Sequence, residues 1–340
     1  MPSPLEVYYA TNYSNCDITY SFLASAEGLA FYCHICQIFA LPFQILAAYI
    51  IIAKTPNVMK SMKMPLLVNH FCCTLLDIQV CTLSTPYLLL RNLSGFTVGL
   101  FSKIGVPNIV QLGFGVFSVF VMISSYVFIF ECRSAQLIEN RFRMRRTSCR
   151  VCYHGLLLLF NLSVFVYGWF VPSDQESAKI KSLDLESCPT KEFFTNDVLV
   201  IFEVDVLDFA SYIHCPVLSI HVNLHFLFHV GCTVYYLYIA PSHTISVETR
   251  KFQRKFLVGI TIQTLIPMAL LLILFCITLM TETFDGYYQS MMNAAVIGLA
   301  MHGLVHEFVI EWNLIPRKLF NMCALLRIRY VGEEIPSNAE

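Results

Sequence analysis

The sequence predicts an all-α membrane protein, a bundle of seven transmembrane helices with its N-terminus outside and its C-terminus in the cytoplasm. Three observations predict this fold. The 340 residues are 56% hydrophobic and only 13% charged, against about 25% charged residues in an ordinary soluble domain. Seven apolar runs are long enough to cross a bilayer. The basic residues gather in alternate connections between these runs.

A transmembrane helix needs about 20 mostly apolar residues. The start of the fifth run is the least distinct, because apolar residues begin at Val198. Glu203, Asp205 and Asp208 nevertheless indicate that this first stretch lies outside the hydrocarbon. The chain then divides into an outer segment 1–28, a helical domain 29–310 and a cytoplasmic tail 311–340. The predicted spans are 29–53, 64–90, 106–130, 151–171, 212–238, 256–280 and 288–310.

The orientation follows from the 22 Lys and Arg residues. Three lie in 54–63, six in 131–150, four in 239–255 and four in the tail, which leaves five for the other side of the bilayer. Cytoplasmic loops carry the excess of basic residues in membrane proteins. We therefore expect these four segments to face the cytoplasm, where the basic loop 131–150 meets anionic lipid or a protein partner.

The N-terminal segment adds three expectations about the outer side. It has no Lys or Arg and no early apolar core, so the first span is expected to act as its own insertion signal. Asn12 and Asn92 begin Asn-X-Ser sequons, and we expect both to carry glycan. Cys16 and Cys188 fall in the oxidising compartment, where they pair with each other, pair with Cys33 or remain thiols.

Asp77 lies near the middle of the second predicted span. A charge there costs about 2.5–3.5 kcal/mol on insertion scales, so it must face the interior, pair or be protonated. One interpretation is a polar ligand cavity or a switch contact. The other is a structural hydrogen bond between helices, with Asn69 or His302 as the partner.

The fifth span contains His214, His221, His225 and His229, spaced by seven, four and four residues. This spacing places them on one helical face, which we expect to point inward, because lipid offers histidine no partners. A ligand cavity and plain interhelical hydrogen bonding both fit. A shared metal ion is weaker, because no Cys or carboxylate ligand accompanies the histidines, and we expect no metal site.

The sequence gives no case for catalysis or for a cofactor. It contains no phosphate-binding glycine loop, no nucleophile elbow and no paired carboxylates of a hydrolase. The order His302, His306, Glu307 differs from that of the HExxH zinc motif. The net charge of −1 gives no indication of nucleic-acid binding.

Several short motifs, in this order, are similar to one receptor family. The second span reads LLVNHFCCTLLDIQVCTLSTPYLLL over 66–90, followed by LSGF. Beyond it come Glu-Asn-Arg at 139–141 and Cys-Pro at 188–189, and then Phe-Phe at 193–194. Gln263 and Pro267, Met-His-Gly at 301–303 and Pro-Arg-Lys at 316–318 complete the set. The chain resembles the nematode serpentine chemoreceptors of the Str superfamily, and within it the Srh class.

The chain departs from the family pattern at two motifs. Glu-Asn-Arg begins nine residues after the predicted end of the third span, which is farther than the family pattern has it. Pro-Arg-Lys lacks the tyrosine of the family's Pro-Tyr-Arg.

The resemblance implies a chemosensory G-protein-coupled receptor in the plasma membrane of sensory neurons and their cilia. Its partners would be a small environmental molecule, a heterotrimeric G protein and the bilayer. Glu139 and Arg141 would then form the cytoplasmic switch. For the polar part of a ligand cavity we select Asp77, His221, His225 and His302.

Two other functions compete with the receptor. An odorant-gated ion channel would need a selectivity ring, of which the sequence shows no sign. A transporter would need broken helices at paired positions in two halves, and no such repeat is evident.

Overall fold

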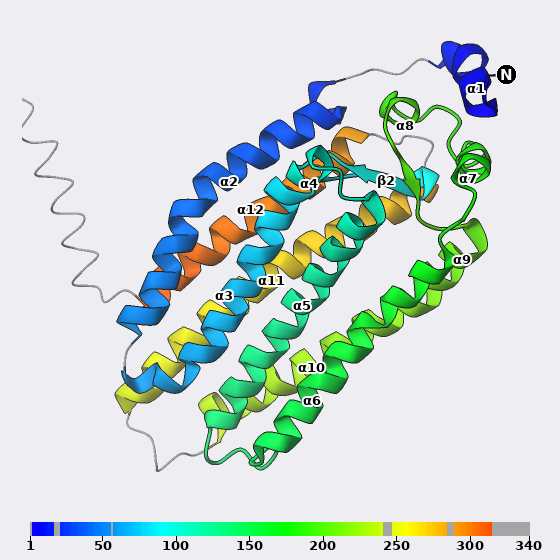
Figure 1. The fold of residues 1–340 in the computed structure, drawn as a ribbon. Helices are drawn as coiled ribbons and strands as arrows, with labels where there is room; N and C mark the ends of the chain where they lie inside the picture. The colour runs from blue at the N-terminus through cyan, green and yellow to red at the C-terminus, as the bar shows by residue number, and fades with distance from the viewer. Residues whose placement is uncertain (1, 17–20, 56, 241–246, 284–288, 315–340) are drawn as a thin grey trace, which may run out of the picture.

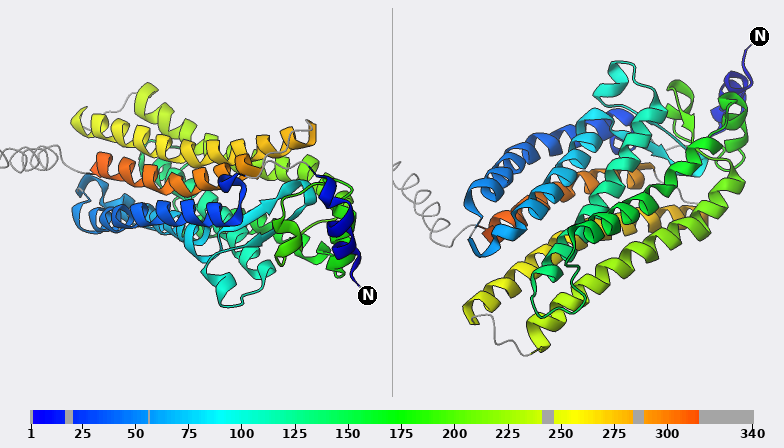
Figure 2. Two further views of the ribbon diagram at one scale, coloured as in Figure 1. Left: turned by 90° about the horizontal axis from the view of Figure 1, so that it is seen from above. Right: turned by 60° about the horizontal axis from the view of Figure 1, so that its bottom comes forward.

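The protein is described from a computed structural model that covers residues 2–16, 21–55, 57–240, 247–283 and 289–314. Its long helices run side by side, with small elements gathered at one end (Figures 1 and 2). The long helices are α2 (Ala26–Tyr49), α3 (Lys63–Ile78), α5 (Asn108–Gln136), α6 (Thr147–Asn161), α10 (Cys215–Val234), α11 (Val247–Thr283) and α12 (Gln289–Leu314).

Several of these helices continue as a turn of different pitch. π-Helical turns extend α2 over Ile50–Lys54 and α3 over Gln79–Leu83, and they flank α10 over Ala210–His214 and Tyr235–Ile239. A 3₁₀ segment extends α6 over Leu162–Phe170. The short helices are α1 (Pro4–Thr11), α4 (Leu100–Lys103), α7 (Gln175–Ser182), α8 (Glu192–Thr195) and α9 (Val204–Phe209).

Five helical segments are long and apolar enough to cross a membrane, within the part of the chain that the structure describes. They are Ala26–Lys54, Met59–Leu83, Asn108–Gln136, Thr147–Phe170 and Tyr212–Ile239, and each overlaps one of the first five predicted spans. Helix α11 covers the sixth predicted span, and α12 covers residues 289–310 of the seventh.

The boundaries of two predicted spans were wrong. The second span ends as a helix at Leu83 rather than at residue 90, because the chain turns at Thr85, which has a φ of 45° and precedes Pro86. Apolar residues 86–89 then form a strand, which hydropathy alone does not separate from a helix. The third span continues as helix to Gln136, six residues beyond its predicted end.

The middle of the bundle is made by α3 and α5. In the apolar 18-residue stretch of Met59–Leu83, which contains most of α3, 56% of the residues are buried, against 17% in the corresponding stretch of Thr147–Phe170, which contains α6. On the side of the sheet, Leu76, Met122 and Tyr126 belong to one buried apolar cluster. At the opposite end Leu66 of α3 and Phe130 of α5 belong to a second buried apolar cluster. Side chains from α3 and α5 therefore hold both halves of the bundle together.

A small antiparallel sheet closes one end of the bundle, in the strand order β1 (Pro86–Leu89), β2 (Ser94–Thr97) and β3 (Leu199–Val200). Two glutamine side chains lie at its edges. Gln289 donates to the carbonyl of Leu88 at 3.0 Å. Gln175 accepts from the backbone N–H of Val200 at 2.8 Å and donates to its carbonyl at 3.3 Å.

Helix α1 lies at the same end of the molecule, against α7 and α8 (Figure 1). A disulfide joins Cys16 to Cys188, and the hydroxyl of Tyr8 donates to the carbonyl of Ser187 at 3.0 Å. The ring of Phe194 packs against those of Tyr9 and Tyr13, at centroid distances of 4.9 and 4.8 Å, and the two tyrosine rings lie 5.2 Å from each other. A covalent bond and an aromatic cluster thus fix the N-terminal helix.

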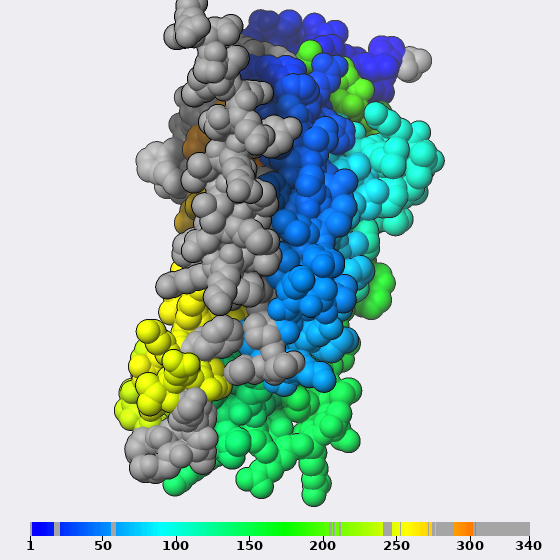
Figure 3. Space-filling view, turned by 90° about the vertical axis from the view of Figure 1, so that its left-hand side faces the viewer, coloured from blue at the N-terminus to red at the C-terminus, as the bar shows by residue number. Residues whose placement is uncertain are grey.

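The long sides of the bundle expose apolar side chains. Figure 3 shows α2, in blue, along one such side. On this helix Phe39 and Ile45 are 63% and 64% exposed, whereas Ala40 and Ala47 are buried. Large apolar residues that face outward along a helix with buried small residues on its other side are typical of a lipid-facing surface.

Candidate functional site

Asp77 is buried in the contact between α3, α2 and α12. Its Oδ2 accepts a hydrogen bond from Nε2 of Gln44 at 3.1 Å. Gln44 in turn accepts from Nε2 of Gln37, seven residues earlier on α2, so this second hydrogen bond spans Pro42. A Cβ atom at Gly303 of α12 would collide with the Asp77 carboxylate. The absence of a side chain at residue 303 therefore makes room for the carboxyl group of Asp77.

The same side of α3 carries two more polar contacts, four and eight residues before Asp77. Nδ2 of Asn69 donates to Oγ of Ser125 at 2.8 Å, and Sγ of Cys73 lies 3.4 Å from the hydroxyl of Tyr126. Residues four apart share a helix face, so the spacing of Asn69, Cys73 and Asp77 produces a polar line along α3. This line joins α3 to α5 and α2.

The four histidines of the fifth span all lie against α6 and its 3₁₀ extension, as their spacing predicts. His214 contacts Ser163 at 2.9 Å and Tyr167 at 2.7 Å. The ring of His221 packs on Phe160, with centroids 4.3 Å apart. One hydroxyl, that of Tyr153, lies 2.7 Å from Nδ1 of His225 and 3.1 Å from Nε2 of His229.

The hydrogen bonds around His229 have a definite direction. The hydroxyl of Ser134 donates to the carbonyl of Glu131, so it accepts from Nδ1–H of His229, 3.1 Å away. A neutral His229 then accepts at Nε2 from Tyr153, whose oxygen accepts from Nδ1–H of His225. A chain of hydrogen bonds therefore runs from α10 through α6 and back through α10 to α5.

A buried carboxylate lies beside this chain. Glu131 of α5 is 1% exposed, and the guanidinium of Arg150 on α6 binds both of its oxygens, at 3.0 Å from Nε and 2.6 Å from Nη2. Nε2 of His154 lies 3.3 Å from the same carboxylate. Such a two-point contact is the strong geometry for an arginine and a carboxylate. We call Glu131, Arg150, Tyr153, His154, His225 and His229, with Ser134, the inner polar network.

The predicted ligand residues fall into two groups rather than one cavity. The contacts of Asp77 lie on α2 and α12, whereas those of His221 and His225 lie on α6. Helix α5 runs between α3 and α6 (Figures 1 and 2). The side chain of His302, the fourth predicted residue, lies outside the described part of the chain.

The predicted switch residues, Glu139 and Arg141, lie directly after α5. Because α5 continues to Gln136, the Glu-Asn-Arg motif begins three residues after the end of the helix. The predicted separation of nine residues from the third span was therefore wrong. Between them Asn140 is buried and donates from Nδ2 to the carbonyl of Ser134 at 3.0 Å. The backbone N–H of Arg141 donates to the hydroxyl of Tyr236 at 3.2 Å, and its side chain is exposed.

A second arginine at this end is buried. Arg133 is 3% exposed, its guanidinium lies 5.7 Å from the ring centroid of Phe256 on α11, and Nη1 donates to Gln136 at 3.2 Å. A cation within about 6 Å of a ring face is attracted by it. Arg133 therefore joins the end of α5 to α11.

The structure separates the two predicted glycosylation positions. Asn12 is exposed at the end of α1. The prediction for Asn92 is corrected, because this side chain is 1% exposed and its Nδ2 donates to the carbonyls of Ser182 and Glu186 at 3.0 and 3.1 Å. A glycan needs that nitrogen. The sequon is a local pattern and does not reveal that α7 folds over the asparagine.

The alternatives for Cys16 are resolved in the same region. Its partner is Cys188, and Cys33 is a buried free thiol on α2. Among the described side chains, no group of three or more His, Cys, Asp or Glu residues is arranged to hold a metal ion.

Sequence reasoning missed Glu131 and Arg133 as buried residues, and it missed Arg150 as the partner of Glu131. It ended the third span at Phe130 and assigned all three to a cytoplasmic loop, where charges are ordinary. The available signal for Glu131 and Arg133 was that residues 131–136 contain no Gly or Pro and continue the helical pattern, so both charged residues belong to the last turns of the helix. Tyr153 had no distinguishing sequence signal.

Two comparisons with known proteins identify the family. Residues 24–311 match the model of the serpentine type 7TM GPCR chemoreceptor Srh. The chain is also 31% identical over 319 residues to serpentine receptor class H-72 of Caenorhabditis elegans, an alignment that covers 93% of this chain and 91% of that receptor. The chain therefore belongs to the Srh family of serpentine chemoreceptors.

Proposed function

We propose that this protein is a chemosensory receptor that binds a small environmental molecule and activates a heterotrimeric G protein. It resides in the plasma membrane of a sensory neuron and its cilium, with residues 1–28 outside, seven spans within 29–310 and the tail 311–340 in the cytoplasm. Family membership and the five membrane-compatible helices support the receptor class. The basic bias of alternate loops supports the orientation.

The inner polar network is the observation that carries the mechanism. It joins α5, α6 and α10 through one buried carboxylate and a few hydrogen bonds near the loop that contains Arg141. Packed interfaces of this kind exchange between discrete arrangements rather than deform continuously. A ligand that binds one arrangement more tightly shifts the population toward it by that difference in affinity.

Asp77, His221, His225 and His302 remain the proposed ligand contacts. His221 has the strongest support, because its Nε2 is buried and makes no hydrogen bond within the described residues. A buried polar atom of this kind favours a ligand that supplies a hydrogen-bonding group. The Asp77 group, on the other side of α5, offers a carboxylate to a ligand that enters between α2, α3 and α12.

Glu139 and Arg141 are the proposed contacts with the G protein. Arg141 is exposed while its backbone is held by Tyr236 of the π-helical turn after α10. Movement of α10 would therefore move this arginine. The disulfide between Cys16 and Cys188 and a glycan on Asn12 belong to the proposed outer side.

The test is a screen of small environmental molecules on cells that express the receptor with a G-protein reporter. With an active molecule in hand, Arg141→Ala is expected to lower the response by about tenfold, as the loss of roughly 1.4 kcal/mol of coupling would do. Arg145→Ala, an exposed arginine of the same loop, serves as the control. Surface expression of both variants is measured by antibody labelling.

An unchanged response to Arg141→Ala would remove this residue from the coupling surface. A ligand-evoked current in membranes that lack the G protein would instead support the channel. Ligand-dependent uptake into vesicles would support the transporter.

A further inference from the structure

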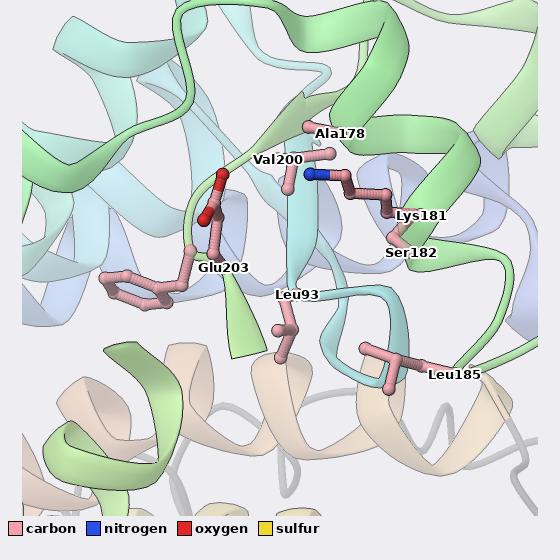
Figure 4. Close-up of a pocket in the computed structure, with 8 residues that line it drawn as sticks. Leu93, Ala178, Lys181, Ser182, Leu185, Val200 and Glu203 are labelled. Carbon is pink, nitrogen blue, oxygen red and sulfur yellow. The ribbon is translucent and has the colours of Figure 1, made fainter. Parts of the chain in front are cut away.

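A cavity of about 190 Å³ opens between α7, the edge of the sheet and the chain after β3. It is separate from both the Asp77 group and the inner polar network. Its lining includes Leu93, Leu185 and Val200 as apolar residues, and Lys181 and Glu203 as charged ones. Figure 4 shows Lys181 and Glu203 on opposite sides of the cavity, with Leu93 and Leu185 below them.

The wall formed by α7 is held at both ends. Asp174 accepts from the N–H of Ser177 at the first turn, and Gln175 binds the backbone of Val200. At the other end Nδ2 of Asn92 donates to the carbonyl of Ser182. An ion pair of 2.8 Å between Arg91 and Glu186 fixes the following residues. The cavity is therefore formed before any ligand arrives, which reduces the entropic cost of binding.

Leu93 forms the floor from an unusual backbone position. Its φ is 51° and its ψ 35°, in the left-handed region that leucine rarely occupies. The carbonyl of Leu93 accepts from the N–H of Ile201 at 2.8 Å, which holds the turn closed. Non-glycine residues in this region cost free energy and cluster at ligand sites.

The size and the charges of the cavity define the ligand. Its volume corresponds to about six water molecules, which is below the size of most drug-like ligands. An ammonium group on one side suits a carboxylate, and a carboxylate on the other side suits an amine. The apolar floor suits a short aliphatic body.

We propose that this cavity binds a small zwitterion with an aliphatic body, of the size of an aliphatic amino acid. The ligand's carboxylate meets Lys181, its ammonium group meets Glu203, and its body covers Leu93 and Val200. The site lies beside the disulfide-linked outer segments, so it captures such molecules from the outside. This role rests on the proposed receptor function, to which it adds an outer capture site, apart from the Asp77 group and the histidines, for one chemical class of ligand.

The test measures binding to the purified full chain in phosphatidylcholine nanodiscs, without G protein. The probes are leucine, isocaproate, which lacks the ammonium group, and isoamylamine, which lacks the carboxylate. Lys181→Gln is expected to weaken leucine and isocaproate by about threefold to tenfold and to leave isoamylamine unchanged. Glu203→Gln is expected to weaken leucine and isoamylamine and to leave isocaproate unchanged.

Lys179→Gln and Glu176→Gln are the matched controls, because both lie on α7 outside the lining and change the same charges. Thermal unfolding confirms that all four variants are folded. The proposal is overturned if leucine does not bind the unaltered protein, if the controls weaken binding as much as the lining variants, or if the probes do not separate by charge. Because no G protein is present, such a failure leaves the coupling experiment with Arg141 unaffected.

Discussion

At the scale of single residues, the position of Asp77 depends on the absence of a side chain at Gly303. Helix α12 passes so close to α3 that only a glycine fits at position 303. Glycine in a helix ordinarily costs about 1 kcal/mol relative to alanine. This cost is offset here by the close approach of two helices around a buried carboxylate with a hydrogen bond from Gln44.

Gly303→Ala is therefore expected to destabilise the protein by about 1–3 kcal/mol, the usual cost of inserting a methyl group into filled space. The control is Gly298→Ala on the same helix, where a new Cβ would lie 3.5 Å from Cδ2 of Leu270, an ordinary contact. Thermal unfolding in detergent measures both variants. Equal stability of the two would show that Asp77 has room to move.

Glu192 makes a second prediction at this scale, one that concerns pH. This residue of α8 is buried, and its Oε1 accepts from the N–H of Ala26 at 3.4 Å. Burial raises the pKa of its carboxyl group above the ordinary value, although hydrogen bonds to backbone N–H groups oppose the shift.

The folded state therefore holds its proton more tightly than the unfolded chain does, and the free energy of unfolding falls as pH rises between the two pKa values. Thermal unfolding from about pH 4 to about pH 7 is expected to show this decrease. Glu192→Gln, which cannot ionise, should flatten that part of the profile. A variant with the unaltered slope would assign the pH dependence to another group.

At the scale of elements, α6 is held to α5 by an asymmetric ion pair. The side chain of Glu131 is 1% exposed, whereas that of Arg150 is 32% exposed. Removal of one partner of a buried pair leaves the other charge without compensation, and this penalty depends on how deeply the remaining charge is buried.

Arg150→Met is accordingly expected to cost more stability than Glu131→Gln, on the order of 3 kcal/mol against about 1 kcal/mol. The arginine left by the second variant reaches water, whereas the carboxylate left by the first remains buried with His154 as a neighbour. Thermal unfolding of the two single variants and the double variant gives the coupling energy. The idea fails if Glu131→Gln is the more harmful change.

The elements also show which features a sequence reveals. The spacing of the histidines placed them on one face because helical periodicity is local, and the structure has that face against α6. Hydropathy could not separate the strand after Leu83 from a helix, because the same apolar residues suit both. Local sequence patterns could not predict the partners of Glu131, because Arg150 contacts it only once α6 has folded back against α5.

At the scale of the whole molecule, the family and the helical bundle followed from the sequence, but the grouping of the polar side chains within the bundle did not. Asp77 and the histidines each suit a polar interior, and helical spacing alone does not place them on separate sides of α5. The outer elements were equally hidden. Asn92 was read as a surface sequon, whereas two carbonyl groups of distant residues bind its amide.

The orientation of the chain gives the prediction at this scale. Asn12 is exposed, so it is expected to carry glycan, and Asn12→Gln should increase the mobility of the protein on a gel as glycosidase treatment does. Asn92→Gln should leave the mobility unchanged, because that residue is buried. A tag after residue 340 should react with antibody only in permeabilised cells. Labelling of intact cells would reverse the proposed orientation.

The glutamines at the two sheet edges, Gln175 and Gln289, have a consequence for receptors that crowd together in a membrane. An open strand edge invites pairing with a strand of a neighbouring molecule, which leads to aggregation. Gln175 occupies the free N–H and carbonyl of Val200, and Gln289 occupies the carbonyl of Leu88. Each receptor thus covers part of its own strand edges, which leaves neighbouring copies fewer free groups for a shared sheet.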